Sequence, residues 1–188
     1  MSTEGLQQAF DSTRGVLAKV QKDQLGDPTP CASWDVRTLV NHVVGGAHWF
    51  AACVNDGSSD DSGDDLPDFA SGDFLTTFDE GAKAAVAAFG ADGAMEKMLK
   101  LPFGTFPGAA FLGLATTDAF THGWDLAKAT GQSTDLAPEF AAALLEGAKA
   151  SIPDEFRGPE GAAFGPKQEA PKGATAADEL AAFLGRKP

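Results

Sequence analysis

The spacing of apolar residues is the feature that most limits the folds open to this chain. In its first segment, residues that recur at intervals of four and three share one helical face: Leu6, Phe10, Thr13, Leu17 and Val20. A similar spacing predicts a helix over residues 75–89. Alternating helix and strand patterns, which would indicate a doubly wound sheet, are absent. The chain is therefore expected to be mostly helical.

Prolines and glycines divide the helical segments. Ser33 is expected to cap a second helix that ends near Gly57. A fourth helix is expected to begin near Pro107 and to end at Gly131, and a fifth to begin near Pro138. The segment before Pro107 is interpreted as an extended connection with one short strand.

Two segments lack helical periodicity. The acidic stretch DGSSDDSGDDLPD, residues 56–68, is interpreted as a solvated linker, with an anion-repelling or metal-collecting role as the alternative. Residues 152–188 are expected to form a Pro/Gly-rich arm and a short terminal helix. Together these patterns predict one all-α domain over residues 1–188, a four-helix bundle with a short C-terminal extension.

Charge and composition exclude several classes of protein. The 188 residues carry a formal net charge of −13, which argues against nucleic acid and anionic membranes as partners. No apolar run reaches the length of about 18 residues that can span a bilayer, and the N-terminus has no signal-peptide pattern. The two cysteines lack CxxC spacing, so neither a disulfide scaffold nor a thiolate zinc site is expected. A cytoplasmic protein is the simplest interpretation.

Asp118 and His122 raise the question of chemistry, because they follow a charge-free stretch, residues 101–117. At a spacing of four they lie on one helical face, where they can bind a metal ion, join a hydrogen-bond network or meet water. Asp125 falls nearly on the same face. It is a candidate for accepting a hydrogen bond from the N–H of a metal-bound imidazole, or it accepts one from a backbone amide or an indole N–H instead.

His42 lies on the second predicted helix, beside an apolar stripe. It is either a hydrogen-bonded core residue or a metal ligand. With Asp118 and His122 it would form a site of two imidazoles and one carboxylate, which leaves coordination positions open. His48 is rotated off the face of His42 and is expected outside the site, whereas Trp49 shares that face and is a candidate pocket-lining residue.

Cys31 directly precedes the second helix and is interpreted as a reactive thiol or as a small packing residue. Cys53 is expected in the core. Trp34 and Trp124 are expected in the core or in a pocket wall.

Two segments, PTPCASWDVRTLVNHVVGGAHWF and HGWDLAKATG, together resemble the signatures of the DinB-like, mycothiol-dependent maleylpyruvate isomerase superfamily. More narrowly, the chain resembles a short actinobacterial metal-binding branch that ends in a segment like FGPKQEAPKGATAADELAAFLGRKP. The resemblance spans most of the chain, from about Leu6 to Pro188. It implies a four-helix bundle that binds a divalent metal ion, zinc in first place and nickel as the alternative.

Carried over by position, the resemblance implies His42, His122 and Asp118 as the metal ligands. Relatives have glutamate or histidine where this chain has Asp118. Aspartate is one methylene shorter, so either the metal ion lies closer to this helix or the carboxylate reaches it through water.

The resemblance also implies a thiol cosubstrate, mycothiol. The isomerase relatives carry an additional C-terminal domain, for which this chain is expected to be too short. The expected reaction is therefore defined less narrowly than maleylpyruvate isomerisation: a metal- and mycothiol-dependent S-transferase or isomerase that acts on a small electrophile. The protein is expected to be a monomer or homodimer. The alternatives are a non-catalytic metal-binding or stress-related binding protein, and a metal-free bundle with an Asp118–His122 ion pair.

Overall fold

The computed structural model describes residues 1–31, 33–59, 66–158 and 164–188. Most of the described chain is helical, as predicted, and a small two-stranded sheet accompanies the helices. The elements are α1 (Thr3–Leu17), η1 (Lys22–Gln24), α2 (Val36–Asp56), η2 (Phe69–Ser71), α3 (Phe74–Phe89), β1 (Met98–Leu101), β2 (Gly104–Pro107), α4 (Gly108–Ala129), α5 (Pro138–Ser151), η3 (Asp154–Phe156) and α6 (Ala176–Phe183).

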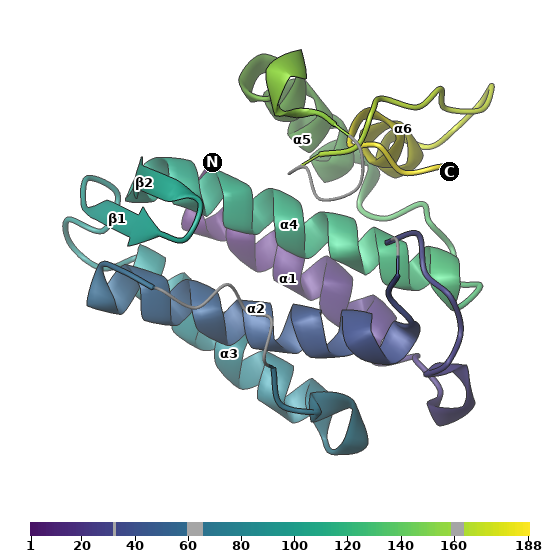
Figure 1. Ribbon diagram of the computed structural model, residues 1–188, viewed down its shortest axis with the longest axis horizontal. Coiled ribbons are helices and arrows are strands. Elements are labelled where there is room, and N and C mark those ends of the chain that lie inside the picture. Colours follow the sequence, from purple (N-terminus) through teal and green to yellow (C-terminus); the bar gives the residue numbers. More distant parts are fainter. Residues whose placement is uncertain (32, 60–65, 159–163) are drawn as a thin grey trace.

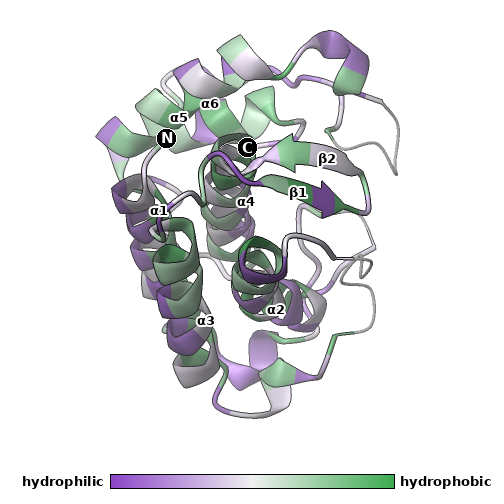
Figure 2. Ribbon diagram, turned by 90° about the vertical axis from the view of Figure 1, so that its left-hand side faces the viewer, coloured by the Kyte–Doolittle hydropathy of each residue, from purple (hydrophilic) through white to green (hydrophobic). Residues whose placement is uncertain are grey.

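The long helices α1 to α4 pack lengthwise around a common core (Figure 1). Helix α1 contacts α3 and α4, and α2 contacts the same two helices from the other side. Their hydrophobic faces turn toward one another, while hydrophilic residues line the outer faces of α1 and α3 (Figure 2). Large aromatic side chains fill the interior, with Phe10 edge-on to Phe78 at a ring separation of 5.7 Å. The burial of these apolar faces stabilises the bundle.

Two glycines allow these helices to approach closely. A β-carbon on Gly81 of α3 would lie 2.7 Å from the His48 ring on α2, and one on Gly123 of α4 would overlap the Thr13 hydroxyl on α1. The Thr13 hydroxyl instead donates a hydrogen bond of 2.7 Å to the Ala119 carbonyl of α4. Both helix pairs therefore depend on the absence of a side chain at these positions.

The structure departs from the sequence-based expectation at two places. The segment before α4 is an antiparallel hairpin, β1 with β2, instead of a connection with one strand, so the fold is not purely helical. Asp35, not Ser33, caps α2, because its carboxylate accepts the Thr38 N–H at 2.8 Å. Ser33 has a φ of 67° and belongs to the preceding turn. The other predicted helices begin and end close to the expected residues.

Helices α5 and α6 pack against each other beside α4, and α6 contacts α4 directly (Figure 1). The predicted arm and terminal helix are thus present, although residues 159–163 of the arm lie outside the described residues. Six residues of the predicted acidic linker, residues 60–65, also lie outside them. Among the described helices, none has the length and apolar character to cross a bilayer.

Candidate metal centre

Three side chains from two helices lie close together in the bundle. His42 comes from α2, and Asp118 and His122 come from successive turns of α4. The Nε2 atom of His122 lies 3.4 Å from Oδ1 of Asp118, and Nε2 of His42 lies 3.9 Å from Oδ2 of the same carboxylate. One donor atom from each residue lies within 4.8 Å of the other two. The packing of α2 on α4 thus provides the proximity that spacing alone could not establish.

These separations suit a shared cation. Donor atoms that bind one zinc ion at 2.0–2.2 Å lie roughly 3.4 Å apart in a tetrahedral arrangement. The Nε2 atom of His42 is buried and has no hydrogen-bond partner within the described chain, and its 3.9 Å distance from Asp118 is too long for a hydrogen bond. A buried polar atom without a partner is costly, and a cation between these three residues would remove that cost. The donor set therefore fits a divalent metal ion.

The cluster is open to solvent on one side. The side chains of His42 and Asp118 are 31% and 39% exposed, whereas that of His122 is only 11% exposed. His42 and Asp118 therefore contribute most of the solvent-exposed surface of the cluster, and His122 contributes little. A metal site with open coordination positions requires such solvent access, whereas a closed structural site does not.

Charge interactions set the protonation of the two helix-α4 residues. Burial alone would raise the pKa of Asp118, but attraction to the neighbouring imidazoles, His122 above all, holds that pKa well below its usual value. Burial alone would lower the pKa of His122, but Asp118 and Asp125, which flank its two ring nitrogens, raise it well above its usual value. Without a metal ion, the two residues form an ion pair.

The other nitrogen of His122 faces a hydrogen-bond network. Its Nδ1 lies 3.0 Å from Oδ2 of Asp125. The same oxygen accepts a hydrogen bond from the Cys31 thiol at 3.2 Å. Arg186, in the C-terminal tail, donates from Nη2 to the same oxygen at 3.0 Å. The Asp125 side chain has no exposed surface, and although burial alone would raise its pKa, His122 and Arg186 lower it. Asp125 thus lies where the sequence interpretation expected a carboxylate that holds an imidazole N–H.

A second donor group, Cys31, His122 and Asp125, also lies within coordinating distance of one another. The Arg186 guanidinium already occupies both oxygens of Asp125, at 3.0 and 3.3 Å. A positive charge in that position repels a metal ion and removes the carboxylate lone pairs that would bind it. The hydrogen bonds of Asp125 therefore leave the Asp118 group as the better candidate for a metal ion.

Trp34 covers the histidine rings. Its ring centroid lies 4.8 Å from that of His42 and 5.9 Å from that of His122. The turn before α2 brings Trp34 and Cys31 into the site, because the Trp34 N–H donates to the Cys31 carbonyl at 3.1 Å and Ser33 adopts a left-handed conformation. Such backbone strain often occurs at functional sites.

The remaining histidine and the predicted pocket residue lie elsewhere. His48 is partly buried on the face of α2 that meets α3, with Nε2 2.8 Å from the Thr77 carbonyl, so it is outside the cluster as expected. Trp49 lies further along α2, packs against Phe111 and donates to Ser59. The aromatic ring beside His42 is therefore Trp34, and a pocket-lining role for Trp49 stays a prediction.

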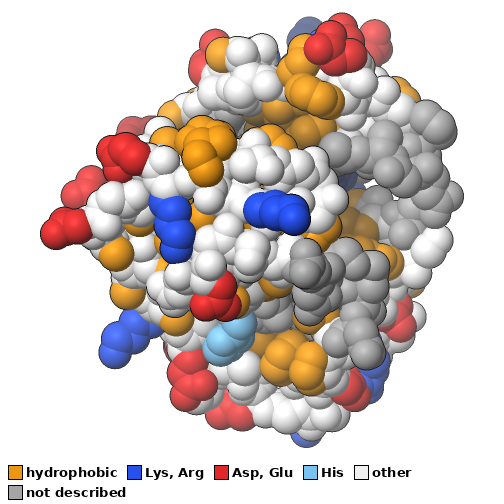
Figure 3. Space-filling model, turned by 60° about the vertical axis from the view of Figure 1, so that its left-hand side comes forward, with side chains coloured by type: hydrophobic (Ala, Val, Ile, Leu, Met, Phe, Trp, Pro, Cys, Tyr) orange, Lys and Arg blue, Asp and Glu red, His pale blue; other side chains and the backbone are white. Residues whose placement is uncertain are grey.

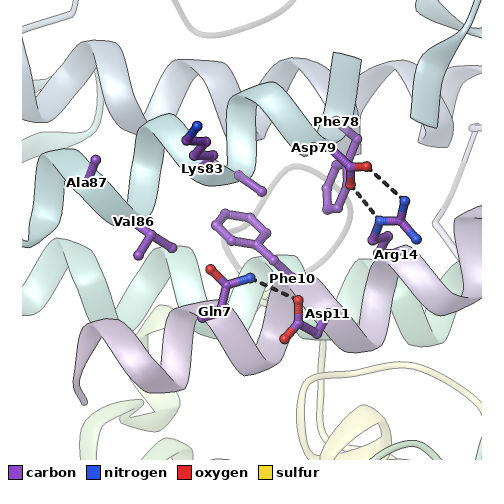
Figure 4. Close-up of a pocket in the computed structure, with 10 residues that line it drawn as sticks. Gln7, Phe10, Asp11, Arg14, Phe78, Asp79, Lys83, Val86 and Ala87 are labelled. Atoms are coloured by element: carbon purple, nitrogen blue, oxygen red, sulfur yellow. Dashed lines mark hydrogen bonds and ion pairs between the residues drawn. The ribbon is translucent and has the colours of Figure 1, made fainter. Parts of the chain in front are cut away.

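A separate groove of about 410 Å³ lies between α1 and α3 (Figure 4). Phe10 and Phe78 line it, and four of its polar residues pair with one another, Arg14 with Asp79 at 2.6 Å and Gln7 with Asp11 at 2.8 Å. It contains none of the clustered donor residues. On the face in Figure 3, Lys and Arg side chains are scattered singly, and acidic side chains are present on the same face.

Sequence reasoning left Trp34 as a core or pocket-wall residue and Cys31 as a reactive thiol or packing residue, and it did not identify Arg186 as part of the site. Trp34 and Cys31 lie within the quoted PTPCASWD segment, so proximity to His42 in sequence was an available signal. Arg186 gave no local signal, because its partner Asp125 is 61 residues away.

Comparisons with known proteins agree with these observations. Residues 6–127 match the family described as the mycothiol maleylpyruvate isomerase N-terminal domain. Two uncharacterized proteins, from two strains of Mycobacterium tuberculosis, are each 42% identical over 184 residues, which cover 96% of this chain and 94% of the relative. No solved structure matches the chain. The matched segment includes the three clustered residues and Asp125, and it ends before α5.

Proposed function

Because the chain belongs to the family of the mycothiol maleylpyruvate isomerase N-terminal domain, we propose that it binds a divalent metal ion and acts on a small electrophile with a thiol cosubstrate. The metal ligands are His42, Asp118 and His122, zinc is the first choice of metal and nickel the second, and mycothiol is the thiol that the family suggests. The reaction class is S-transfer or isomerisation. The observation that carries the proposal is the buried, unpartnered Nε2 of His42 next to the Asp118 and His122 donors.

The chain's own residues prepare the site for this chemistry. Asp125 accepts a hydrogen bond from Nδ1–H of His122, so Nε2, once deprotonated, directs its lone pair toward Asp118 and His42. Asp118 is ionised at neutral pH because of its lowered pKa. A divalent ion held here supplies Lewis acidity, which lowers the pKa of a bound thiol and favours the nucleophilic thiolate. Partial exposure of His42 and Asp118 leaves room for that thiol.

The proposal extends to the architecture. We assign α1 to α4 to the four-helix bundle of DinB-like proteins, with α5, α6 and the tail as a short extension within one domain, residues 1–188. A cytoplasmic location and a monomeric or homodimeric state belong to the same proposal.

A thiol-transfer assay tests the function. Purified protein loaded with zinc or nickel is incubated with mycothiol and a panel of small electrophiles, and loss of free thiol is followed over time. We expect thiol consumption that is abolished in His122→Ala and retained in His48→Gln, the matched histidine outside the cluster. Stoichiometric metal without any thiol-dependent reaction would instead support the alternative, a non-catalytic metal-binding or stress-related protein.

A further inference from the structure

The C-terminal tail reaches back to the candidate metal centre through Arg186. Its Nη2 lies 3.0 Å from Oδ2 of Asp125 and its Nε lies 3.3 Å from Oδ1, so the guanidinium engages both carboxylate oxygens. The Asp125 side chain is fully buried, and that of Arg186 is 19% exposed. A buried carboxylate needs a charged or hydrogen-bonded partner, and Arg186 is the guanidinium that faces it.

Arg186 is held in place by the end of α6. Its backbone N–H donates to the Ala181 carbonyl, and Gly185, with a φ of 96°, turns the chain after α6. Asp178, in the first turn of α6, accepts the Trp124 indole N–H at 2.9 Å. Two consecutive residues of α4, Trp124 and Asp125, thus each bind the C-terminal segment.

Successive residues are rotated by about 100° around a helix, so the residues of the HGWD sequence in α4 reach different neighbours. His122 faces the cluster, Gly123 faces α1, and Trp124 and Asp125 face the C-terminal segment. The metal centre and the docking of the tail therefore share one helical turn.

We propose that Arg186 is a positioning residue of the metal centre and that the segment 176–188 completes the site. This inference rests on the proposed metal binding. Arg186 fixes the Asp125 carboxylate in the orientation that accepts Nδ1–H of His122, and Asp125 in turn fixes the His122 ring with Nε2 toward Asp118. Arg186 and the segment 176–188 lie beyond the matched family segment, which ends at residue 127.

Zinc affinity of the full-length chain tests the proposal by competition with a chromophoric chelator. We expect Arg186→Gln to weaken zinc binding about tenfold, since removal of a residue that supports a ligand typically costs 10–100-fold. Lys187→Gln removes the same charge from the next, exposed residue and is expected to bind zinc like the wild type. Arg186→Lys, which keeps the charge but loses the two-pronged contact, is expected to recover part of the affinity.

A further control separates positioning from folding. Asp178→Asn weakens the Trp124 contact of the tail without touching Asp125, so it is expected to lower the thermal stability of the metal-free chain and to leave zinc affinity unchanged. Asp125→Asn is expected to lower zinc affinity by a smaller factor in the Arg186→Gln variant than in the wild type, because both substitutions remove the same contact.

The outcomes distinguish the two proposals. Zinc binding by Arg186→Gln as tight as in the wild type, or an equal loss in Lys187→Gln, would overturn the role of Arg186 and leave the proposed function intact. A wild-type chain that binds no divalent metal would overturn both.

Discussion

The Nε2 atom of His42 lies 3.9 Å from Oδ2 of Asp118, across the interface of α2 and α4. This distance is too long for a hydrogen bond, and the nitrogen is buried without a partner in the described chain. The two groups are close enough to bind one cation together. The proposed metal site depends on this separation of His42 and Asp118.

Asp118 is expected to bind the metal ion directly, because its two oxygens already lie 3.4 and 3.9 Å from the two imidazole nitrogens. Asp118→Asn keeps the shape of the side chain but removes its charge, and we expect metal affinity to fall by at least about 100-fold. Asp118→Glu keeps the charge and is expected to stay within about tenfold of the wild type. Chelator competition measures both. Equal affinities of Asp118→Asn and the wild type would contradict direct binding.

Metal affinity is expected to rise with pH. Burial alone would lower the pKa of His122, but Asp118 and Asp125 raise it, so the metal-free ring holds a proton that must leave before Nε2 can bind a metal ion. Apparent affinity should rise by up to about tenfold per pH unit below this raised pKa and level off above it. Calorimetry in two buffers with different protonation enthalpies measures the released proton. Metal binding at neutral pH without proton release would contradict the predicted rise of metal affinity with pH.

Much of the helical architecture was predictable because its signals are local. Apolar spacing predicted α1 and α3, Pro138 and Gly131 marked helix ends, and the structure has them there. The N-cap of α2 was misassigned to Ser33, since both Ser33 and Asp35 are good capping residues and only the backbone turn distinguishes them. The hairpin escaped prediction because β1 and β2 are only four residues long, and burial alternates along β1 but not along β2.

The site was predictable in its residue types but not in its geometry. The spacing of Asp118 and His122 follows from the helical repeat, whereas the approach of His42 depends on how α2 packs on α4. Arg186 was beyond sequence reasoning, because its contact with Asp125 exists only after the tail folds back.

Gly123 is expected to be essential for the packing of α1 on α4. Gly123→Ala places a β-carbon on the Thr13 hydroxyl, and such overpacking typically costs about 1–3 kcal/mol. Gly113→Ala, on the same helix, is the control: the nearest atom there is Met1 Cγ at 3.7 Å, and alanine favours helix by up to about 1 kcal/mol. Urea unfolding measures both free energies of unfolding. If Gly123→Ala left the free energy of unfolding unchanged, α1 and α4 would be able to move apart without loss of stability, which would contradict this prediction.

Asp35→Ala is expected to destabilise the start of α2 by about 1 kcal/mol, because it removes the acceptor of the Thr38 N–H. Asp35→Asn keeps an acceptor and should be close to the wild type. The Thr38 hydrogen bonds lower the pKa of Asp35 below 3.8, so its contribution is present above that pH and is lost as the pH falls through the lowered pKa. Thermal unfolding of the two variants at neutral and acid pH checks both points; equal stability of Asp35→Ala and the wild type at neutral pH would contradict the cap.

The most direct measurement of the central claim is the metal stoichiometry of the purified, chelator-stripped chain after titration with zinc, beside His42→Ala and His48→Ala. We expect one zinc ion per wild-type chain, the same value in His48→Ala, and loss of tight binding in His42→Ala, because His42 supplies one of the three donors that lie within 4.8 Å of one another. Full and equally tight zinc binding by His42→Ala, or no zinc in the wild type, would contradict the metal centre.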